Sequence, residues 1–217
     1  ARNLGVAQMA QGKPDLALEA YTLAVNNEGT DEMLALAYVS RAEIYMHQHS
    51  YKLALDDLNA AIDLDDKLET HALRIVAAYH AGDFDTAQED ADLLLSTGTI
   101  TNSEIYLIQA RMLVDEGGRA RDYNNALDLM NLVGGGLPNE LGAVLQEYRA
   151  RANYELGNFG PALDQIDQAI VAADSGSRHY LRGMVYEEFD DPESAIADYQ
   201  WVLTWDAVYD FSFVDDA

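Results

Sequence analysis

The chain has 217 residues, of which 49% are hydrophobic, enough for a sizeable core. Its 13 basic and 38 acidic side chains give a formal net charge of -25, which argues against nucleic acid or an anionic membrane surface as a partner, because Lys and Arg are needed to bind phosphate. The lack of cysteine excludes disulfides, thiolate nucleophiles and Cys-ligated metals, and no apolar run approaches the roughly 20 residues that span a bilayer.

The chain begins with ARNLGVAQMAQG, which has no apolar signal-peptide region and is typical of the middle of a helix. We therefore expect the first structural unit to be truncated. Any targeting segment, or a larger parent protein, is expected to lie outside this sequence, so the compartment is not predicted.

An alanine recurs along the chain at nearly constant spacing. It occurs at Ala17, Ala54, Ala87, Ala126, Ala162 and Ala195, separated by 37, 33, 39, 36 and 33 residues. Twelve positions before it, most units carry a second residue that is usually small: Gly5, Ala42, Ile75, Ala150 or Gly183. Small residues at a fixed phase allow two helices to approach closely, so the pattern predicts repeated helical hairpins.

This pattern resembles the tetratricopeptide repeat, a helix-turn-helix unit of about 34 residues. The resemblance covers essentially the whole chain and is most specific in the last unit, which has Gly183, Tyr186, Ala195 and Tyr199 at the expected positions. It implies an all-α fold, a right-handed α-solenoid of about six units.

We expect residues 1–208 to form a single solenoid, followed by an acidic, aromatic tail at residues 209–217. The units are predicted at residues 1–30, 35–67, 68–100, 102–137, 139–174 and 175–207. An insertion in the fourth unit places Arg119 and Arg121 on a loop. Residues 134–138, three glycines, a leucine and a proline, interrupt the helical pattern most strongly and indicate a longer connection or a slight hinge. A phosphate-binding loop is not favoured, because no Lys-Ser/Thr pair follows the glycines.

Arginine precedes the small position in four of the first helices. Three of these units have an aspartate sixteen residues later, giving Arg41 with Asp57, Arg74 with Asp90 and Arg182 with Asp198, whereas Arg149 is followed by Gln165. The pairing predicts a partly buried, bidentate ion pair that fixes the register of the hairpin.

Catalysis has little support in the sequence. The five histidines form no Ser-His-acid or His-x-x-x-His pattern. His47 and His80 share a phase in adjacent units. A metal site between them is one interpretation and ordinary exposed positions are the other, and we favour the exposed positions. We therefore expect no enzyme activity, no cofactor and no metal.

The resemblance implies a concave groove lined by the first helix of every unit, which binds a peptide or a partner's helix. In the first half this phase includes Arg2, Val6, Met9, Val39, Glu43, Met46, His47, Ala72, Val76, Tyr79 and His80. The second half is favoured because Tyr and Arg contribute most to interface energy. The predicted groove residues are Tyr79, Arg111, Tyr148, Arg151, Tyr154, Tyr180 and Met184.

The predicted function is a non-catalytic protein-protein interaction scaffold, with a neutral, mixed-charge or basic protein or peptide ligand. The Lys and Asn residues with which some family members bind a chaperone's C-terminal carboxylate are replaced here by Arg2, Val6, Ser40, Glu69 and Leu73, so that clamp is not expected. The alternative is a regulatory or scaffolding segment of a larger protein, such as an enzyme or a secreted assembly factor.

Overall fold

The structure is a computed structural model that describes the chain except for residues 28, 99–102, 116–120, 136 and 210–217. The described residues form twelve α-helices and no strand, so the all-α prediction is confirmed. Arg119 and nearly all of the predicted tail lie outside the described residues. Among the helices described, none is long and apolar enough to cross a membrane.

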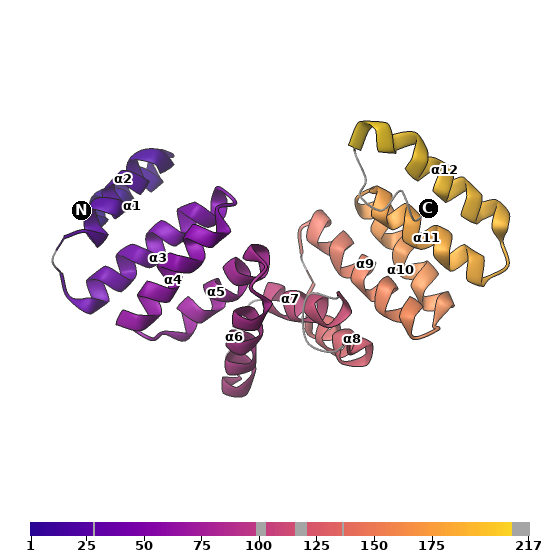
Figure 1. Cartoon of the computed structure of the whole chain (residues 1–217), viewed down its shortest axis with the longest axis horizontal. Helices are drawn as coiled ribbons and strands as arrows, with labels where there is room; N and C mark the ends of the chain where they lie inside the picture. The colour runs from indigo at the N-terminus through magenta and orange to yellow at the C-terminus, as the bar shows by residue number, and fades with distance from the viewer. Residues whose placement is uncertain (28, 99–102, 116–120, 136, 210–217) are drawn as a thin grey trace. The chain divides into compact units, whose positions relative to one another are not determined.

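The helices follow one another as pairs along the chain (Figure 1). Their bounds are α1 (Arg2–Ala10), α2 (Pro14–Val25), α3 (Asp31–His47), α4 (Tyr51–Leu64), α5 (Leu68–Ala81), α6 (Phe84–Thr97), α7 (Ser103–Val114), α8 (Tyr123–Leu132), α9 (Asn139–Glu155), α10 (Phe159–Ala172), α11 (Gly176–Glu188) and α12 (Pro192–Tyr209).

Turn residues end the first helix of a pair and start the second. Gly82 ends α5 in the left-handed conformation, at φ 82°, which glycine adopts without a steric penalty. The side chain of Asp83 then accepts a hydrogen bond from the backbone N–H of Thr86 at 3.2 Å and caps α6. Asp191 caps α12 in the same way through Ser194, at 3.2 Å. The second helix can therefore fold back along the first.

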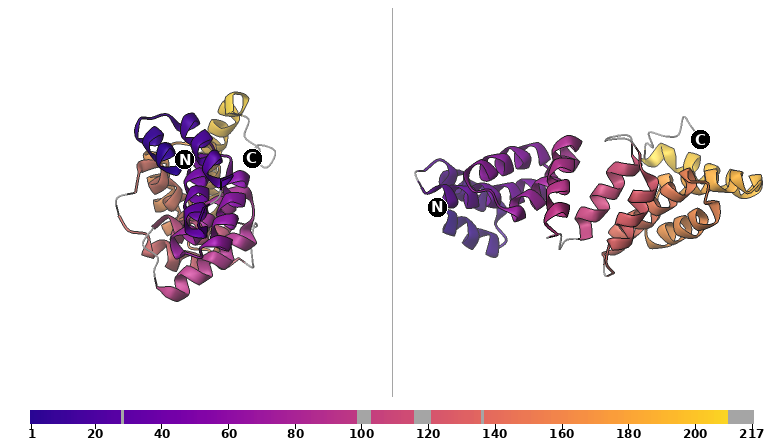
Figure 2. Two further views of the ribbon diagram at one scale, coloured as in Figure 1. Left: turned by 90° about the vertical axis from the view of Figure 1, so that its left-hand side faces the viewer. Right: turned by 90° about the horizontal axis from the view of Figure 1, so that it is seen from below.

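The contacts divide the chain into two compact units, Ala1–Ile108 and Gln109–Ala217. Helices of a pair pack together, as α3 does with α4 and α9 with α10 (Figures 1 and 2). Several second helices also pack on the next first helix: α2 on α3, α4 on α5, α8 on α9 and α10 on α11. The boundary between the two units lies inside α7, so it does not coincide with the break predicted at residues 134–138.

The recurring small residues lie where two helices touch. The exposed fraction is 0% for Ala17, Ala54, Ala87, Ala126 and Ala162, and 2% for Ala195. A Cβ atom added to Gly183 would lie 2.5 Å from Cε1 of Tyr199, and Gly5 faces Tyr21 in the same way. The spacing found in the sequence thus marks the contact line of each hairpin, where there is no room for a larger side chain.

The predicted Arg–Asp pairs are present in three hairpins. In each, Nε and Nη2 of the arginine donate to the two carboxylate oxygens of the aspartate. The distances are 2.7 and 2.7 Å for Arg41–Asp57, 2.7 and 2.8 Å for Arg74–Asp90, and 2.8 and 2.7 Å for Arg182–Asp198. The three aspartate side chains are at most 7% exposed. This geometry fixes the register of the two helices.

The third guanidinium nitrogen of each arginine, Nη1, reaches the second helix of the preceding hairpin. Its acceptors are Thr22 for Arg41 at 3.4 Å, Asn59 for Arg74 at 2.7 Å and Asp167 for Arg182 at 2.8 Å. One side chain therefore holds three helices together, a role that the sequence analysis did not predict.

Arg149 differs because its unit has Gln165 in place of the aspartate. Its Nη2 donates to the carbonyl oxygen of Met130 in α8 at 2.9 Å, and burial lowers the pKa of the guanidinium. Gln165 instead accepts a hydrogen bond from Asn153 at 2.9 Å. Arg149 thus keeps the link to the preceding hairpin but not the ion pair within its own.

Candidate binding surfaces

The first helices of successive hairpins line a cavity of about 630 Å³ in the unit Ala1–Ile108, which we call the first cavity. Its described lining comes from α1, α3, α5 and α7, apart from Tyr21 and Tyr51. The lining residues are Met9, Tyr21, Ser40, Glu43, Met46, His47, Tyr51, Glu69, Ala72, Leu73, Val76, His80 and Glu104. They include seven of the eleven first-half positions that the repeat phase assigned to the inner face, whereas Arg2, Val6, Val39 and Tyr79 are not among them.

The first cavity has an apolar part and an acidic part. Met46, Leu73 and Val76 provide aliphatic surface from α3 and α5, and Glu43, Glu69 and Glu104 provide carboxylates from α3, α5 and α7. Burial raises the pKa of Glu43, although His47 and Arg2 act in the opposite direction. None of the described lining residues is Lys or Arg.

A smaller cavity of about 390 Å³ lies in the unit Gln109–Ala217, and we call it the second cavity. Its described lining is Val114, Asp115, Arg121, Arg151, Tyr154, Glu155, Leu181 and Met184. Three of the seven groove residues predicted from the sequence, Arg151, Tyr154 and Met184, therefore lie together at this cavity. Its lining carries both signs of charge.

Tyr148 is largely taken up by contacts within the protein. It is 8% exposed, and its hydroxyl donates to Oδ2 of Asp115 at 2.6 Å. The guanidinium carbons of Arg111 and Arg151 lie 5.0 and 5.2 Å from the centre of the ring. Burial raises the pKa of the hydroxyl, and the carboxylate of Asp115 adds to the effect.

The other predicted tyrosines are half-buried against aromatic rings. The ring centres of Tyr79 and Tyr154 lie 5.7 Å from those of Phe84 and Phe159, and Tyr180 lies 5.8 Å from Tyr199. Each of these contacts joins the first and second helices of one hairpin. The tyrosines thus contribute to hairpin packing, and their role in partner binding stays a prediction.

Glu147 is a buried carboxylate on α9. It is 6% exposed and accepts hydrogen bonds from Arg151 and Arg178, both at 2.9 Å. Arg178 also donates to the carbonyl oxygen of Ala173. Glu147 therefore links α9 to the start of α11.

Two histidines extend the Arg–Asp pairs into larger networks. Nδ1 of His71 lies 2.6 Å from Oδ1 of Asp90, and its Nε2 lies 2.7 Å from Oδ1 of Asp66. His71 is 6% exposed. Because Asp66 precedes α5, this histidine ties the connection between two hairpins to the ion pair inside the second one.

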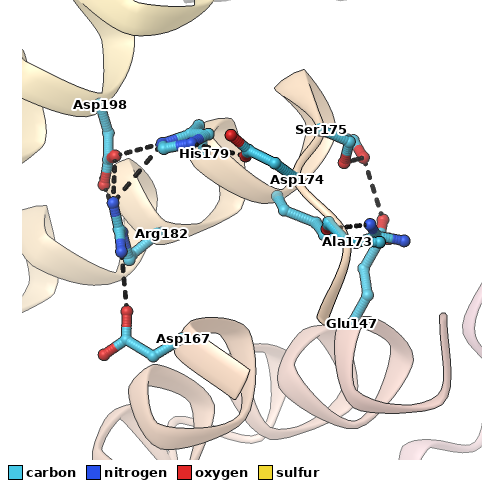
Figure 3. A network of polar contacts seen from close by, with 10 residues as sticks. Glu147, Asp167, Ala173, Asp174, Ser175, His179, Arg182 and Asp198 are labelled. Carbon is cyan, nitrogen blue, oxygen red and sulfur yellow. Dashed lines mark hydrogen bonds and ion pairs between the residues drawn. The ribbon is translucent and has the colours of Figure 1, made fainter. Parts of the chain in front are cut away.

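The same arrangement recurs in the last hairpin (Figure 3). His179 lies 2.6 Å from Asp198 through Nδ1 and 2.9 Å from Asp174 through Nε2, and its ring stacks on Trp201 with the centres 4.0 Å apart. Arg182 lies beside it and reaches both Asp198 and Asp167.

These networks link helices through hydrogen bonds and leave no free histidine nitrogen for catalysis. Both ring nitrogens of His71 and His179 face carboxylate oxygens, so neither is available to take a proton from a nucleophile. Among the described residues, no group of three or more His, Cys, Asp or Glu side chains could hold a metal ion.

The acid stability of the last hairpin should depend on Asp198. Burial of Asp198 acts to raise its pKa, but the hydrogen bonds from Arg182 and His179 outweigh burial, so the net pKa is lowered. The stabilisation is therefore fully present above the unfolded-state pKa of about 4 and is lost as the pH falls through the lower folded-state value.

We expect Asp198→Asn to lower the melting temperature at pH 7, and the difference from the wild type to shrink as the pH falls below about 4, towards the lowered folded-state pKa of Asp198. Thermal unfolding followed by circular dichroism across this range measures the difference. An equal difference at every pH would contradict the assignment.

No protein-family model matches the sequence, and no curated protein matches it at a significant level. Similar solved structures are tetratricopeptide repeat proteins. One from Parabacteroides merdae ATCC 43184 has a TM-score of 0.56 at 21% identity, over 94% of this chain and 76% of that one. YrrB, described as a TPR protein with an unusual peptide-binding site, has a TM-score of 0.63 at 17% identity, over 86% and 92%.

MamA from AMB-1 has a TM-score of 0.62 at 18% identity, over 80% of this chain and 92% of that one. At these identities the similarity is one of fold. The chain has the tetratricopeptide repeat fold, as the spacing of its small residues predicts.

Proposed function

We propose that the chain is a non-catalytic scaffold that binds an extended segment of a partner protein on the first helices of its hairpins. The observation that carries this proposal is the first cavity, because four successive first helices contribute to one surface with both aliphatic and polar groups. A peptide-binding site is named in the description of YrrB, which has the same fold, and this supports the proposal.

The arrangement of the histidines supports the non-catalytic part of the proposal. His71 and His179 are held between carboxylates, and His80 stacks on Tyr51 with ring centres 4.6 Å apart. A hydrolytic site needs a nucleophile, a base and a group that orients the base. His71, His179 and His80 instead contact carboxylates and an aromatic ring that pack the helices together.

The seven residues predicted from the sequence form a second candidate surface in this proposal. Arg151, Tyr154 and Met184 line the second cavity, where a mixed-charge segment would meet both an arginine and the carboxylates of Asp115 and Glu155. The first cavity is the principal site because it is larger and because more hairpins contribute to it.

Filling the first cavity should abolish binding there. We would select peptides from a random phage-displayed library on the intact chain and measure their affinity by titration calorimetry. Ala72→Trp places a large ring in the cavity, and we expect it to weaken binding more than about tenfold through steric exclusion.

Leu53→Trp is the matched control, because Leu53 is 50% exposed on the second helix α4 and does not line the cavity. Its affinity should equal that of the wild type. Equal binding by the Ala72→Trp protein, or equal losses in both variants, would rule out the proposed site.

A further inference from the structure

We propose that the first cavity binds a positively charged segment, in which Lys or Arg side chains lie next to aliphatic ones. This inference rests on the proposed function, because it names the chemistry of the segment that the cavity takes. It excludes the acidic and the purely apolar segments that the tetratricopeptide repeat fold could also accommodate.

Two carboxylates of the cavity, Glu43 and Glu69, have no cation in hydrogen-bonding contact among the described residues. Glu43 and Glu69 accept no hydrogen bond and form no ion pair within the described part of the chain, although His47 and Arg2 act on Glu43, and Lys67 acts on Glu69, from further away. Carboxylates that lie on a concave surface and lack an ion-pair partner favour a bound cation.

Two of the three arginines of the same unit are engaged elsewhere, and the third, Arg2, acts on Glu43 from α1 without an ion pair to any residue that the structure describes. Arg41 and Arg74 make two hydrogen bonds each to Asp57 and Asp90, and these bonds raise the pKa of both guanidinium groups although burial acts against it. They therefore cannot turn to the cavity without breaking a buried ion pair.

The aliphatic part of the cavity fits the stem of a basic side chain. Glu69, Leu73 and Val76 follow one another at helical spacing on α5, so a carboxylate and two aliphatic side chains share one face. A bound Lys or Arg can pack its methylene groups on Leu73 and Val76 while its charged end reaches Glu69. An acidic segment would meet like charges, and a purely apolar one would leave the carboxylates desolvated without a partner.

The negative net charge of the whole chain also favours binding of a positively charged segment. At -25, the protein attracts cationic segments over a distance and repels acidic ones. That attraction is not specific to the cavity, so the test must separate it from local contacts.

The test begins with the composition of peptides selected from a random phage-displayed library on the intact protein. Only peptides that the Ala72→Trp protein fails to bind are counted, because these report on the first cavity. We expect them to be enriched in Lys or Arg next to Leu, Met or Val. Enrichment of acidic or uncharged peptides would overturn the inference.

The second arm uses one selected peptide and a copy in which each Lys is replaced by norleucine, or each Arg by citrulline. We expect the neutral copy, and the Glu43→Gln/Glu69→Gln protein, each to bind about tenfold more weakly in calorimetry. Glu89→Gln is the control, because Glu89 is an exposed glutamate on the second helix α6, outside the cavity. It should bind like the wild type.

The outcomes separate the two proposals. If cavity-dependent peptides are uncharged and indifferent to the Glu43→Gln/Glu69→Gln changes, the charge inference fails while the proposed function stands. If removing the one charge of Glu89 weakens binding about as much as removing each charge of Glu43 and Glu69, the attraction comes from the net charge and the inference fails. If no selected peptide depends on Ala72, both fail.

Discussion

Replacing Asp90 by alanine is expected to lower the free energy of unfolding by about 3 kcal/mol or more. Its side chain is 3% exposed and accepts two hydrogen bonds from Arg74 and one from His71. Truncation leaves a guanidinium and an imidazole beside the core without their acceptor, which costs more than the loss of an exposed ion pair.

Urea denaturation measures the loss, and hydrogen exchange should place it in α5 and α6. The matched control is Glu89→Ala, one residue away and exposed, for which we expect a change within about 0.5 kcal/mol. If Asp90→Ala unfolds at the same urea concentration as the wild type, the network does not hold the hairpin.

Adding one methyl group at Gly183 is expected to destabilise the last hairpin by about 1–3 kcal/mol. The new Cβ would lie 2.5 Å from Cε1 of Tyr199, so the helices α11 and α12 or the tyrosine ring must move. The higher helix propensity of alanine, about 1 kcal/mol, offsets only part of this strain.

Gly142→Ala is a control that we expect to change the stability in the opposite direction. Gly142 lies inside α9, and an added Cβ there meets nothing within 4 Å. We expect this change to stabilise the protein by about 0.5–1 kcal/mol, because only the propensity gain remains. Chemical denaturation of both variants checks the pair. Stabilisation by Gly183→Ala would show that the two helices do not pack as closely as described.

The hairpins could be predicted because packing repeats along the chain. A small residue is required wherever two helices cross at short distance, so Ala54 and Ala162 carry the same information in different units. The Arg–Asp pairs could be predicted for a similar reason. In every hairpin that has such a pair, the aspartate follows the arginine by sixteen residues, as Asp90 follows Arg74.

The histidine networks were missed because they occur in two units only. Their sequence signal is an aspartate five residues before the histidine and an arginine three residues after it, as in Asp66, His71 and Arg74. The pair of Glu147 and Arg178 has no counterpart in another unit. A contact that occurs only once between two hairpins produces no repeated spacing in the sequence, so it cannot be predicted from the repeat pattern.

The inner-face residues could be predicted from the sequence, but the size of the cavity between them could not. Tyr and Arg favoured the second half, yet Tyr148 is held by Asp115 and packs between two arginines. In the first half the inner face combines small and aliphatic residues, such as Ala72 and Val76, which leave room for a ligand. Cavity size depends on rotamers and neighbours that a single sequence does not specify.

Amide hydrogen exchange, measured with and without a peptide selected on the intact chain, tests most directly whether the first helices form the binding surface. We expect slower exchange in α3 and α5, which supply most of the first cavity, and little change in the second helices α4 and α6. Slower exchange confined to α4 and α6, or no change in α3 and α5 at saturating peptide, would contradict the proposed site.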